Sequence, residues 1–230
     1  FITVIGGNGA GKSTMLNLIA GVHKADGGRI ILDGEDLTYK NETQRAKYIG
    51  RVFQDPMMGT APTMMIEENL AMAYRRTKRR TLAWGISQKE RELYRESLAQ
   101  LGLGLEDRMK TKVGLLSGGQ RQAVTLLMAT LQKPKLLLLD EPTSNLDLQN
   151  QHQVLGIVRR ICEETGITAL VIIHDLNLAL RYCDRFLMMR DGEICFYGGP
   201  EIVSRQSIDK VYRIQADVVN VNGKRVVLAG

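Results

Sequence analysis

A glycine-rich turn directly after a short apolar run is the feature that most constrains this chain. The residues Gly6 to Ser13 have the sequence Gly-Gly-Asn-Gly-Ala-Gly-Lys-Ser and follow the apolar run Phe1 to Ile5. A strand, a glycine-rich loop ending in lysine and a hydroxyl residue, and a following helix together form the pattern of a phosphate-binding loop. We therefore expect a strand over 1–5, a helix over 13–20, and a core in which helices pack on a sheet.

The chemistry of this loop comes from its backbone and from Lys12. The glycines let successive N–H groups point at a phosphate, and the helix N-terminus adds partial positive charge. Lys12 is expected to reach the β- and γ-phosphates, and the Ser13 hydroxyl to ligate Mg²⁺. An ordinary glycine-rich turn is the alternative, disfavoured because lysine, hydroxyls and strand coincide. The predicted residues for ATP or GTP binding are Gly6, Asn8, Gly9, Ala10, Gly11, Lys12, Ser13 and Thr14.

A second anion-binding helix start is predicted at Leu116 to Gln120, with the sequence Leu-Ser-Gly-Gly-Gln. Ser117 is a good N-cap, and the two glycines leave bare amides before a helix expected over 121–131. This motif has no lysine of its own, so it is more typical of a lid for phosphates held elsewhere than of a second nucleotide site. Taken alone, it would be only a capped loop.

Two apolar runs end in polar residues that suit catalysis. Leu136 to Leu139 is the pattern of a strand covered on both faces, and Asp140 and Glu141 follow it. The aspartate is expected to help hold Mg²⁺, and the glutamate to orient and deprotonate the attacking water. Another apolar strand, Ile167 to Ile173, ends at His174, which we expect on the same sheet edge and within reach of the γ-phosphate.

Together these residues resemble the nucleotide-binding domain of an ATP-binding cassette (ABC) transporter over nearly the whole chain. Six of the family's motifs occur in order. They are the Walker A loop at 6–14, the glutamine loop at Gln54 within 52–56, the signature at 116–120, the Walker B strand at 136–140 followed by Glu141, the D-loop at 144–147 and the switch histidine His174.

The resemblance implies an α/β fold: a P-loop NTPase core with a mainly parallel sheet, a small antiparallel β part and an α-helical subdomain. It implies catalytic roles for Glu141, His174 and Gln54, and a Mg²⁺ site formed by Ser13, Gln54 and Asp140. Two such domains pair head to tail in the family, with each ATP between one Walker A loop and the partner's signature. That arrangement adds five nucleotide-binding residues, Ser117, Gly118, Gly119, Gln120 and Asp147.

The partners that the resemblance implies are a second ATPase subunit in a homodimer, transmembrane permease subunits and, indirectly, a substrate-binding protein. The expected location is peripheral, on the cytoplasmic face of the inner membrane. The net charge of +6 raises nucleic acid as an alternative partner, but the strongest basic cluster is one short stretch, Arg75 to Arg80. We therefore expect no nucleic-acid partner. The three cysteines, Cys162, Cys183 and Cys195, lack metal-ligand spacing and are predicted to be reduced thiols.

The organisation is expected to be one ABC ATPase domain over 1–230. The nucleotide-binding core covers 1–62 and 116–200, the helical subdomain covers 63–115 with a break near Trp84, and a short appendage covers 201–230. Asn222-Gly223 between valine pairs predicts a hairpin in that appendage. The chain starts at Phe1, so we interpret it as a fragment without the family's first strands and its adenine-stacking aromatic residue.

Two functional hypotheses remain open. The first is a transport ATPase working with transmembrane subunits, with import favoured over export; the second is a soluble ABC ATPase acting on a macromolecule. The residues from Ile173 to Pro200 resemble ATPases of iron-siderophore, haem or cobalamin importers, whereas the front half resembles ATPases associated with amino-acid-like substrates. Other subunits recognise the cargo, so neither resemblance identifies it.

Overall fold

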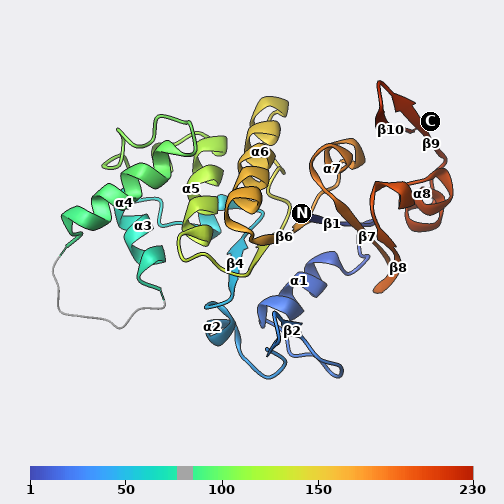
Figure 1. The fold of residues 1–230 in the computed structure, drawn as a ribbon, viewed down its shortest axis with the longest axis horizontal. Helices are drawn as coiled ribbons and strands as arrows, with labels where there is room; N and C mark the ends of the chain where they lie inside the picture. The colour runs from blue at the N-terminus through green and yellow to red at the C-terminus, as the bar shows by residue number, and fades with distance from the viewer. Residues whose placement is uncertain (77–84, 230) are drawn as a thin grey trace. The chain divides into compact units, whose positions relative to one another are not determined.

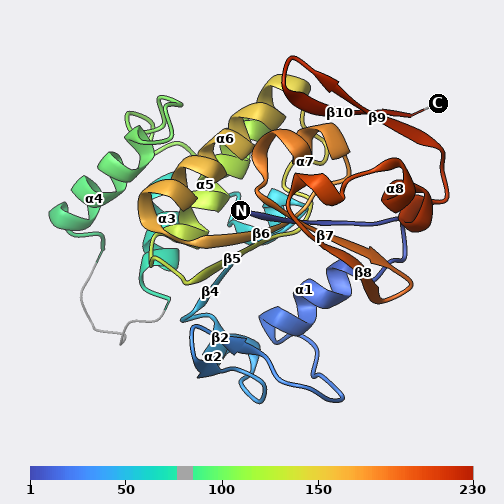
Figure 2. The same cartoon turned by 45° about the vertical axis from the view of Figure 1, so that its right-hand side comes forward.

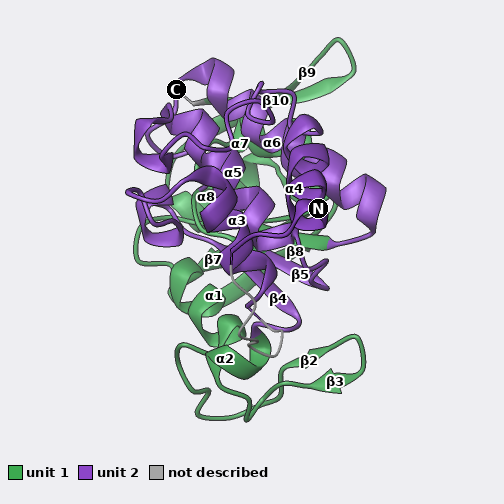
Figure 3. Ribbon diagram, turned by 90° about the vertical axis from the view of Figure 1, so that its left-hand side faces the viewer, with its two compact units in different colours: residues 1–45, 138–141, 168–230 green, residues 46–137, 142–167 purple. Residues whose placement is uncertain are grey.

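The computed structural model describes residues 1–76 and 85–229, which form two compact units (Figure 3). The first unit comprises residues 1–45, 138–141 and 168–230, and the second comprises 46–137 and 142–167. Each unit is described by itself below. Thr77 to Arg80 of the basic cluster and Trp84 at the expected break lie outside the described residues.

The first unit carries most of the strands. They are β1 (Ile2–Ile5), β2 (Ile31–Leu32), β3 (Glu35–Asp36), β6 (Thr168–Ile172), β7 (Arg185–Arg190), β8 (Glu193–Gly198), β9 (Ala216–Val221) and β10 (Lys224–Ala229). Its helices are α1 (Lys12–Ala20), α2 (Glu42–Arg45), α7 (Leu176–Tyr182) and α8 (Arg205–Tyr212), with a 3₁₀ turn η3 (Pro200–Ile202). The strand β5 (Leu136–Leu139) contributes its last two residues to this unit.

The larger sheet is mainly parallel, as expected. Its strand order is β4-β5-β6-β1-β7-β8, where β4 is Ile49–Val52. β1 pairs in parallel with β6 and β7, and β7 pairs antiparallel with β8, as Figure 1 shows. Val4, Ile5 and Ile172 are fully buried neighbours along these strands, which is typical of a sheet covered on both faces. Parallel strands bring the residues after their carboxyl ends to one edge.

The second unit is largely helical. Besides β4 and the start of β5, it contains η1 (Pro56–Gly59), α3 (Ile66–Tyr74), α4 (Gln88–Ala99), η2 (Val113–Leu115), α5 (Gly118–Thr130) and α6 (Leu148–Thr165). α5 is buried on most sides because it packs against α3, α6 and β4. None of the helices in the described parts of the chain has the length and apolar composition needed to cross a membrane.

Most of the expected elements are confirmed. The run 136–139 is β5, whereas β6 is one residue shorter at each end than the expected 167–173. The helix of the second motif begins at Gly118 rather than Arg121, because Ser117 caps it there. Asn222 and Gly223 both have positive φ, the geometry of a type I′ turn, and β9 and β10 pair across them (Figure 2). All three cysteines are free thiols.

Arg45 fixes the far end of the helix that carries the phosphate-binding loop. Its side chain is only 2% exposed, and its guanidinium donates four hydrogen bonds of 2.6 to 3.0 Å to backbone carbonyls. Two of these carbonyls, those of Leu18 and Ile19, belong to the last turn of α1, and the Leu18 carbonyl also accepts from the Gly21 amide at 3.2 Å. Burial lowers the pKa of Arg45. This arginine therefore adds side-chain donors to the carbonyls at the end of α1.

We expect Arg45→Ala to lower the free energy of unfolding by about 3 kcal/mol or more, because it removes four hydrogen bonds to backbone carbonyls and opens a cavity. Urea unfolding of the whole chain measures this change, with the exposed Arg95→Ala as the matched control. A loss no larger than that of the control would show that Arg45 does not hold α1.

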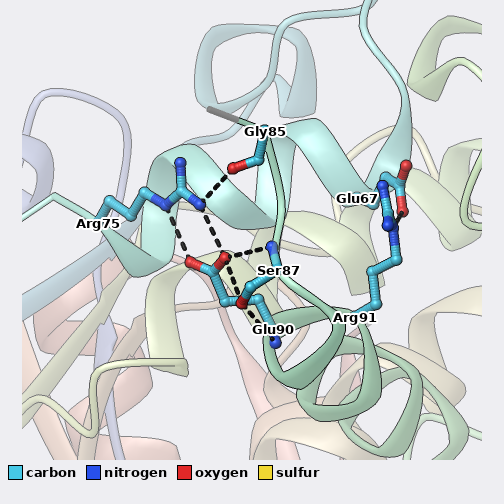
Figure 4. A network of polar contacts seen from close by, with 6 residues as sticks. All are labelled: Glu67, Arg75, Gly85, Ser87, Glu90 and Arg91. Atoms are coloured by element: carbon cyan, nitrogen blue, oxygen red, sulfur yellow. Dashed lines mark hydrogen bonds and ion pairs between the residues drawn. The ribbon is translucent and has the colours of Figure 1, made fainter. Parts of the chain in front are cut away.

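A network of polar contacts joins α3 to α4 in the second unit (Figure 4). Arg75 donates to both carboxylate oxygens of Glu90, at 2.9 and 2.7 Å, and Glu90 also accepts from the Ser87 amide and hydroxyl. Arg91 forms a separate ion pair with Glu67 at 3.1 Å. The hydrogen bonds from Arg75 are the main reason that the pKa of Glu90 is lowered to about 2.

This pair should make stability depend on acid pH. The folded-state pKa of Glu90 lies below its ordinary value of 4.5, so the stability that this ion pair contributes is present above pH 4.5 and is lost as the pH falls through about 2. Near neutral pH, we expect Glu90→Gln to lower the free energy of unfolding by about 1 kcal/mol, a value that allows for the exposure of Arg75. At acid pH, where Glu90 itself becomes protonated, we expect little change. Urea unfolding near neutral pH and at acid pH measures this difference, with Glu96→Gln, at an exposed position, as the control. An equal cost at both pH values would contradict it.

Candidate functional site

The phosphate-binding loop and Lys12 form the base of the site in the first unit. The loop links β1 to α1, and Lys12 is the first residue of that helix. Its ammonium donates to the carbonyl oxygens of Gly6 at 2.8 Å and Gly7 at 2.9 Å, and the residue is 7% exposed. The lysine is thus held inside the curl of the loop.

Two glycines of the loop are required by its geometry. A Cβ on Gly6 would lie 2.4 Å from the carbonyl oxygen of Met189 on β7, so no larger residue fits without a backbone shift. Gly11 caps α1 with φ of 91°, in the left-handed region that favours glycine. The sequence predicted glycines that shape the loop, but it did not indicate that β7 is the neighbour that excludes a side chain.

Ser13 and Asp140 come together as the predicted oxygen ligands. The Ser13 hydroxyl, at the start of α1, donates to Asp140 Oδ1 at 3.2 Å. Asp140 directly follows β5, and its carboxylate lies beside the first residues of α1. Both are hard oxygen groups of the kind that Mg²⁺ binds.

Glu141 and His174 face each other beside the loop. His174 Nε2 lies 2.5 Å from Glu141 Oε1, and Glu141 is the less exposed of the two. Glu141 has a φ of 47°, a left-handed conformation that costs a non-glycine residue about 1 to 2 kcal/mol and is frequent at functional sites. His174 lies between β6 and α7, where Asp175 caps the helix by accepting from the Asn177 and Leu178 amides. This cap fixes the turn that presents the histidine.

The phosphate-binding loop, Glu141 and His174 line one cavity of about 290 Å³ in the first unit. Burial lowers the pKa of Lys12, while the charges of Glu141 and then Asp140 act in the opposite direction and favour the ammonium form. The cavity therefore combines one buried cation, loop amides and a carboxylate–imidazole pair. It is lined by Asn8, Gly9, Ala10, Gly11, Lys12, Ser13, Thr14, Glu141 and His174.

Gln54 belongs to the second unit. It is exposed and follows β4 after one residue. Asp55, the next residue, caps the turn η1 by accepting from the Met57 amide at 2.8 Å. The glutamine is therefore presented on a defined turn at the end of a strand.

The signature residues also lie in the second unit and form the start of α5. Ser117 accepts from the Gln120 amide, and the Gln120 side chain accepts from the Ser117 amide, both at 3.3 Å. This reciprocal capping box satisfies two of the amides at the helix start. A Cβ on Gly119 would lie 2.4 Å from Asn150 Oδ1, so a larger residue here would displace the Asn150 side chain. The predicted helix start is confirmed.

Asp147 of the D-loop has a structural contact that sequence reasoning did not predict. It is the N-cap of α6, and its two carboxylate oxygens accept from the Asn150 amide at 2.8 Å and from its side chain at 2.7 Å. Asn150 also packs against Gly119 of the signature. The D-loop and the signature are therefore linked through Asn150 within the second unit.

The chain is similar in sequence to known ATP-binding proteins. Residues 1–144 match the model of the ABC transporter family. The tyrosine transport ATP-binding protein of Clostridioides difficile (strain R20291) is 41% identical over 194 residues, which cover 84% of this chain and 77% of that protein. The phosphonates import ATP-binding protein of Thiobacillus denitrificans is 31% identical over 213 residues, which cover 93% of this chain and 82% of that protein.

A solved structure has the same architecture. The dimeric structure of a post-hydrolysis state of an ATP-binding cassette bound to ADP and Pi matches with a TM-score of 0.73 and 29% identity, covering 87% of this chain and 85% of that one. The family model covers more than half of the chain, and the sequence relatives are covered over most of their length. The chain therefore belongs to the ABC transporter family.

Proposed function

We propose that this chain binds Mg-ATP on the loop Gly6 to Thr14 and hydrolyses it to drive import through separate transmembrane subunits. The observation that carries this proposal is the cavity in which Lys12, Glu141 and His174 meet the phosphate-binding loop. Family membership supports the same nucleotide chemistry. We retain the division into a nucleotide-binding core, a helical subdomain at 63–115 and a C-terminal appendage as part of this proposal.

The Mg²⁺ site that we propose consists of Ser13 and Asp140, with Gln54 as a further oxygen ligand. The fit rests on the hydroxyl and carboxylate that meet at 3.2 Å beside the loop. Mg²⁺ prefers oxygen ligands and is commonly bound by one or two protein groups together with substrate phosphates. When bound, the ion would neutralise charge on the β- and γ-phosphates.

The proposed reaction is the attack of water on the γ-phosphorus of ATP. A bond forms from the water oxygen to phosphorus, the bond to the bridging β–γ oxygen breaks, and the water proton passes to Glu141. His174 holds the Glu141 carboxylate through their 2.5 Å contact and would reach the γ-phosphate from the same side. Lys12 stabilises the charge that develops on the departing ADP. Positioning and charge stabilisation supply the rate enhancement, because no covalent intermediate is required.

A second copy of the chain would complete the site. The signature residues Ser117 to Gln120 form a helix start with glycine amides but carry no lysine, which suits a phosphate held by another copy. The related cassette of known structure is a dimer bound to ADP and Pi. We propose a head-to-tail homodimer in which Asp147 also approaches the nucleotide of the opposing copy.

The transport role rests on the relatives. One of them is named for tyrosine transport and another for phosphonate import, and both are ATP-binding proteins. We propose that permease subunits hold this chain at the cytoplasmic face of the membrane and that a substrate-binding protein delivers the cargo to them. Gln54 would couple the nucleotide to the permease.

Copurification tests the transport role. The tagged chain is isolated from detergent-solubilised membranes of its own organism, and the retained proteins are identified by mass spectrometry. Recovery of a polytopic membrane subunit, with ATP hydrolysis faster in the complex than in the isolated chain, is the expected result. Recovery with ribosomes or DNA and without a membrane subunit would contradict the transport role and favour a soluble ABC ATPase.

A further inference from the structure

The C-terminal helix α8 contacts the phosphate-binding loop through Tyr212, its last residue. The phenol oxygen of Tyr212 is buried, and no group in the described parts of the chain meets it with the geometry of a full hydrogen bond. The backbone amide of Gly6 faces this oxygen and stabilises its deprotonated form, but burial is stronger and raises the pKa of Tyr212 to about 12. A neutral hydroxyl therefore lies against the first glycine of the loop.

Three groups of the chain lie close to Gly6. Its carbonyl oxygen accepts from the Lys12 ammonium at 2.8 Å. The Met189 carbonyl leaves no room for a side chain on it, because a Cβ would lie 2.4 Å away. Tyr212 faces its amide. If Lys12 turns toward bound phosphates, as proposed above, the Gly6 carbonyl loses its hydrogen bond from the ammonium. Met189 and Tyr212 then remain as the neighbours of Gly6.

The position of α8 is itself fixed by the hairpin of β7 and β8. Arg190 donates to the Lys210 carbonyl of α8 at 2.5 Å, and the Lys210 ammonium lies 5.1 Å from the centre of the Phe196 ring on β8. At the tip of the same hairpin, the Gly192 amide donates to the Ala10 carbonyl of the loop at 3.2 Å. The hairpin therefore contacts both α8 and the loop, which sets where Tyr212 meets Gly6.

We propose that Tyr212 is a positioning residue for nucleotide binding, whose hydroxyl closes onto the Gly6 amide when Lys12 leaves the Gly6 carbonyl for the phosphates. This inference rests on the nucleotide site proposed above. A buried hydroxyl without a hydrogen bond costs free energy, so Tyr212 is unfavourable for the nucleotide-free chain and becomes favourable once the contact closes. The helix α8, outside the catalytic residues, thereby contributes to nucleotide affinity.

The test compares Tyr212→Phe with the unsubstituted chain by isothermal titration with Mg-ADP and by thermal unfolding without nucleotide. The phenylalanine keeps the ring and removes only the hydroxyl. We expect the Kd for Mg-ADP to rise about 3- to 10-fold, the value of one hydrogen bond, while the melting temperature stays equal or rises. Tyr39→Phe is the control, because Tyr39 is 98% exposed. Lys12→Ala is measured alongside to report on the nucleotide site itself.

An unchanged Kd for Tyr212→Phe, with binding lost in Lys12→Ala, would overturn this inference and leave the proposed function standing. A raised Kd accompanied by a lower melting temperature would assign Tyr212 a general structural role and also overturn it. Unchanged binding in both variants would contradict the nucleotide site and, with it, the role of Tyr212.

Discussion

Glu141→Gln is expected to slow ATP hydrolysis by about 100-fold or more while leaving ATP binding intact. Glutamine has nearly the same shape and can keep a contact with His174, but it cannot accept the proton of the attacking water. The loop amides and Lys12, which bind the phosphates, are unchanged by this substitution. The loss should therefore fall on kcat and not on the affinity for nucleotide.

The measurement is steady-state phosphate release at saturating Mg-ATP, together with a nucleotide titration. Glu163→Gln is the matched control, because Glu163 is a 60% exposed glutamate paired with Arg159 on α6. A rate for Glu141→Gln equal to that of the control would show that another group receives the proton. A loss of binding without a change in kcat would also contradict the assignment.

Lys12→Ala is expected to weaken nucleotide binding by about 30-fold or more, because the phosphates lose a buried charge. The lysine is 7% exposed and lies among loop carbonyls, so water compensates only partly for its removal. Its loss also removes the cation whose ammonium form the charges of Glu141 and Asp140 favour. Repulsion between these carboxylates and the phosphates adds to the effect.

Isothermal titration with Mg-ADP measures this change, with Lys89→Ala as the control at an exposed position of α4. Thermal unfolding without nucleotide shows whether each variant is folded. A folded Lys12→Ala chain that binds ADP like the control would contradict the assignment of Lys12 as the phosphate-binding lysine.

The local parts of the site could be predicted from the sequence because each is set by a short pattern. The four leucines of β5 require burial on both faces, so the polar residues after them, Asp140 and Glu141, come at the sheet edge. The loop Gly6 to Ser13 is similarly defined by adjacent residues. The placement of His174 on the same sheet edge as Glu141 followed from the strands that precede them, but the contact between the two side chains did not.

The contacts made between distant parts of the chain could not be predicted. Arg45 occurs in a polar stretch with no apolar periodicity, and only the folded chain brings it to the end of α1. Tyr212 has the sequence context of an ordinary helix end, yet it meets Gly6 from the opposite end of the chain. Asn150 is likewise one polar residue among several in a helix, and its contact with Gly119 depends on how α5 and α6 pack.

The functional roles of the signature and of Gln54 could not be derived from one chain. Their roles depend on a second copy of the chain and on bound nucleotide, so the geometry of one chain gives their local structure alone. The capping box of Ser117 and Gln120 is confirmed as a helix start. Its proposed contact with another copy's phosphates remains a prediction.

Sedimentation velocity of the Glu141→Gln chain with and without Mg-ATP shows whether two copies share the nucleotide site, because slowed hydrolysis should hold the ATP-bound state long enough to be measured. We expect a monomer without nucleotide and a dimer with Mg-ATP, closed by Ser117 to Gln120 of one copy over the phosphate-binding loop of the other. A chain that binds ATP at saturation and stays monomeric would contradict the proposed shared site.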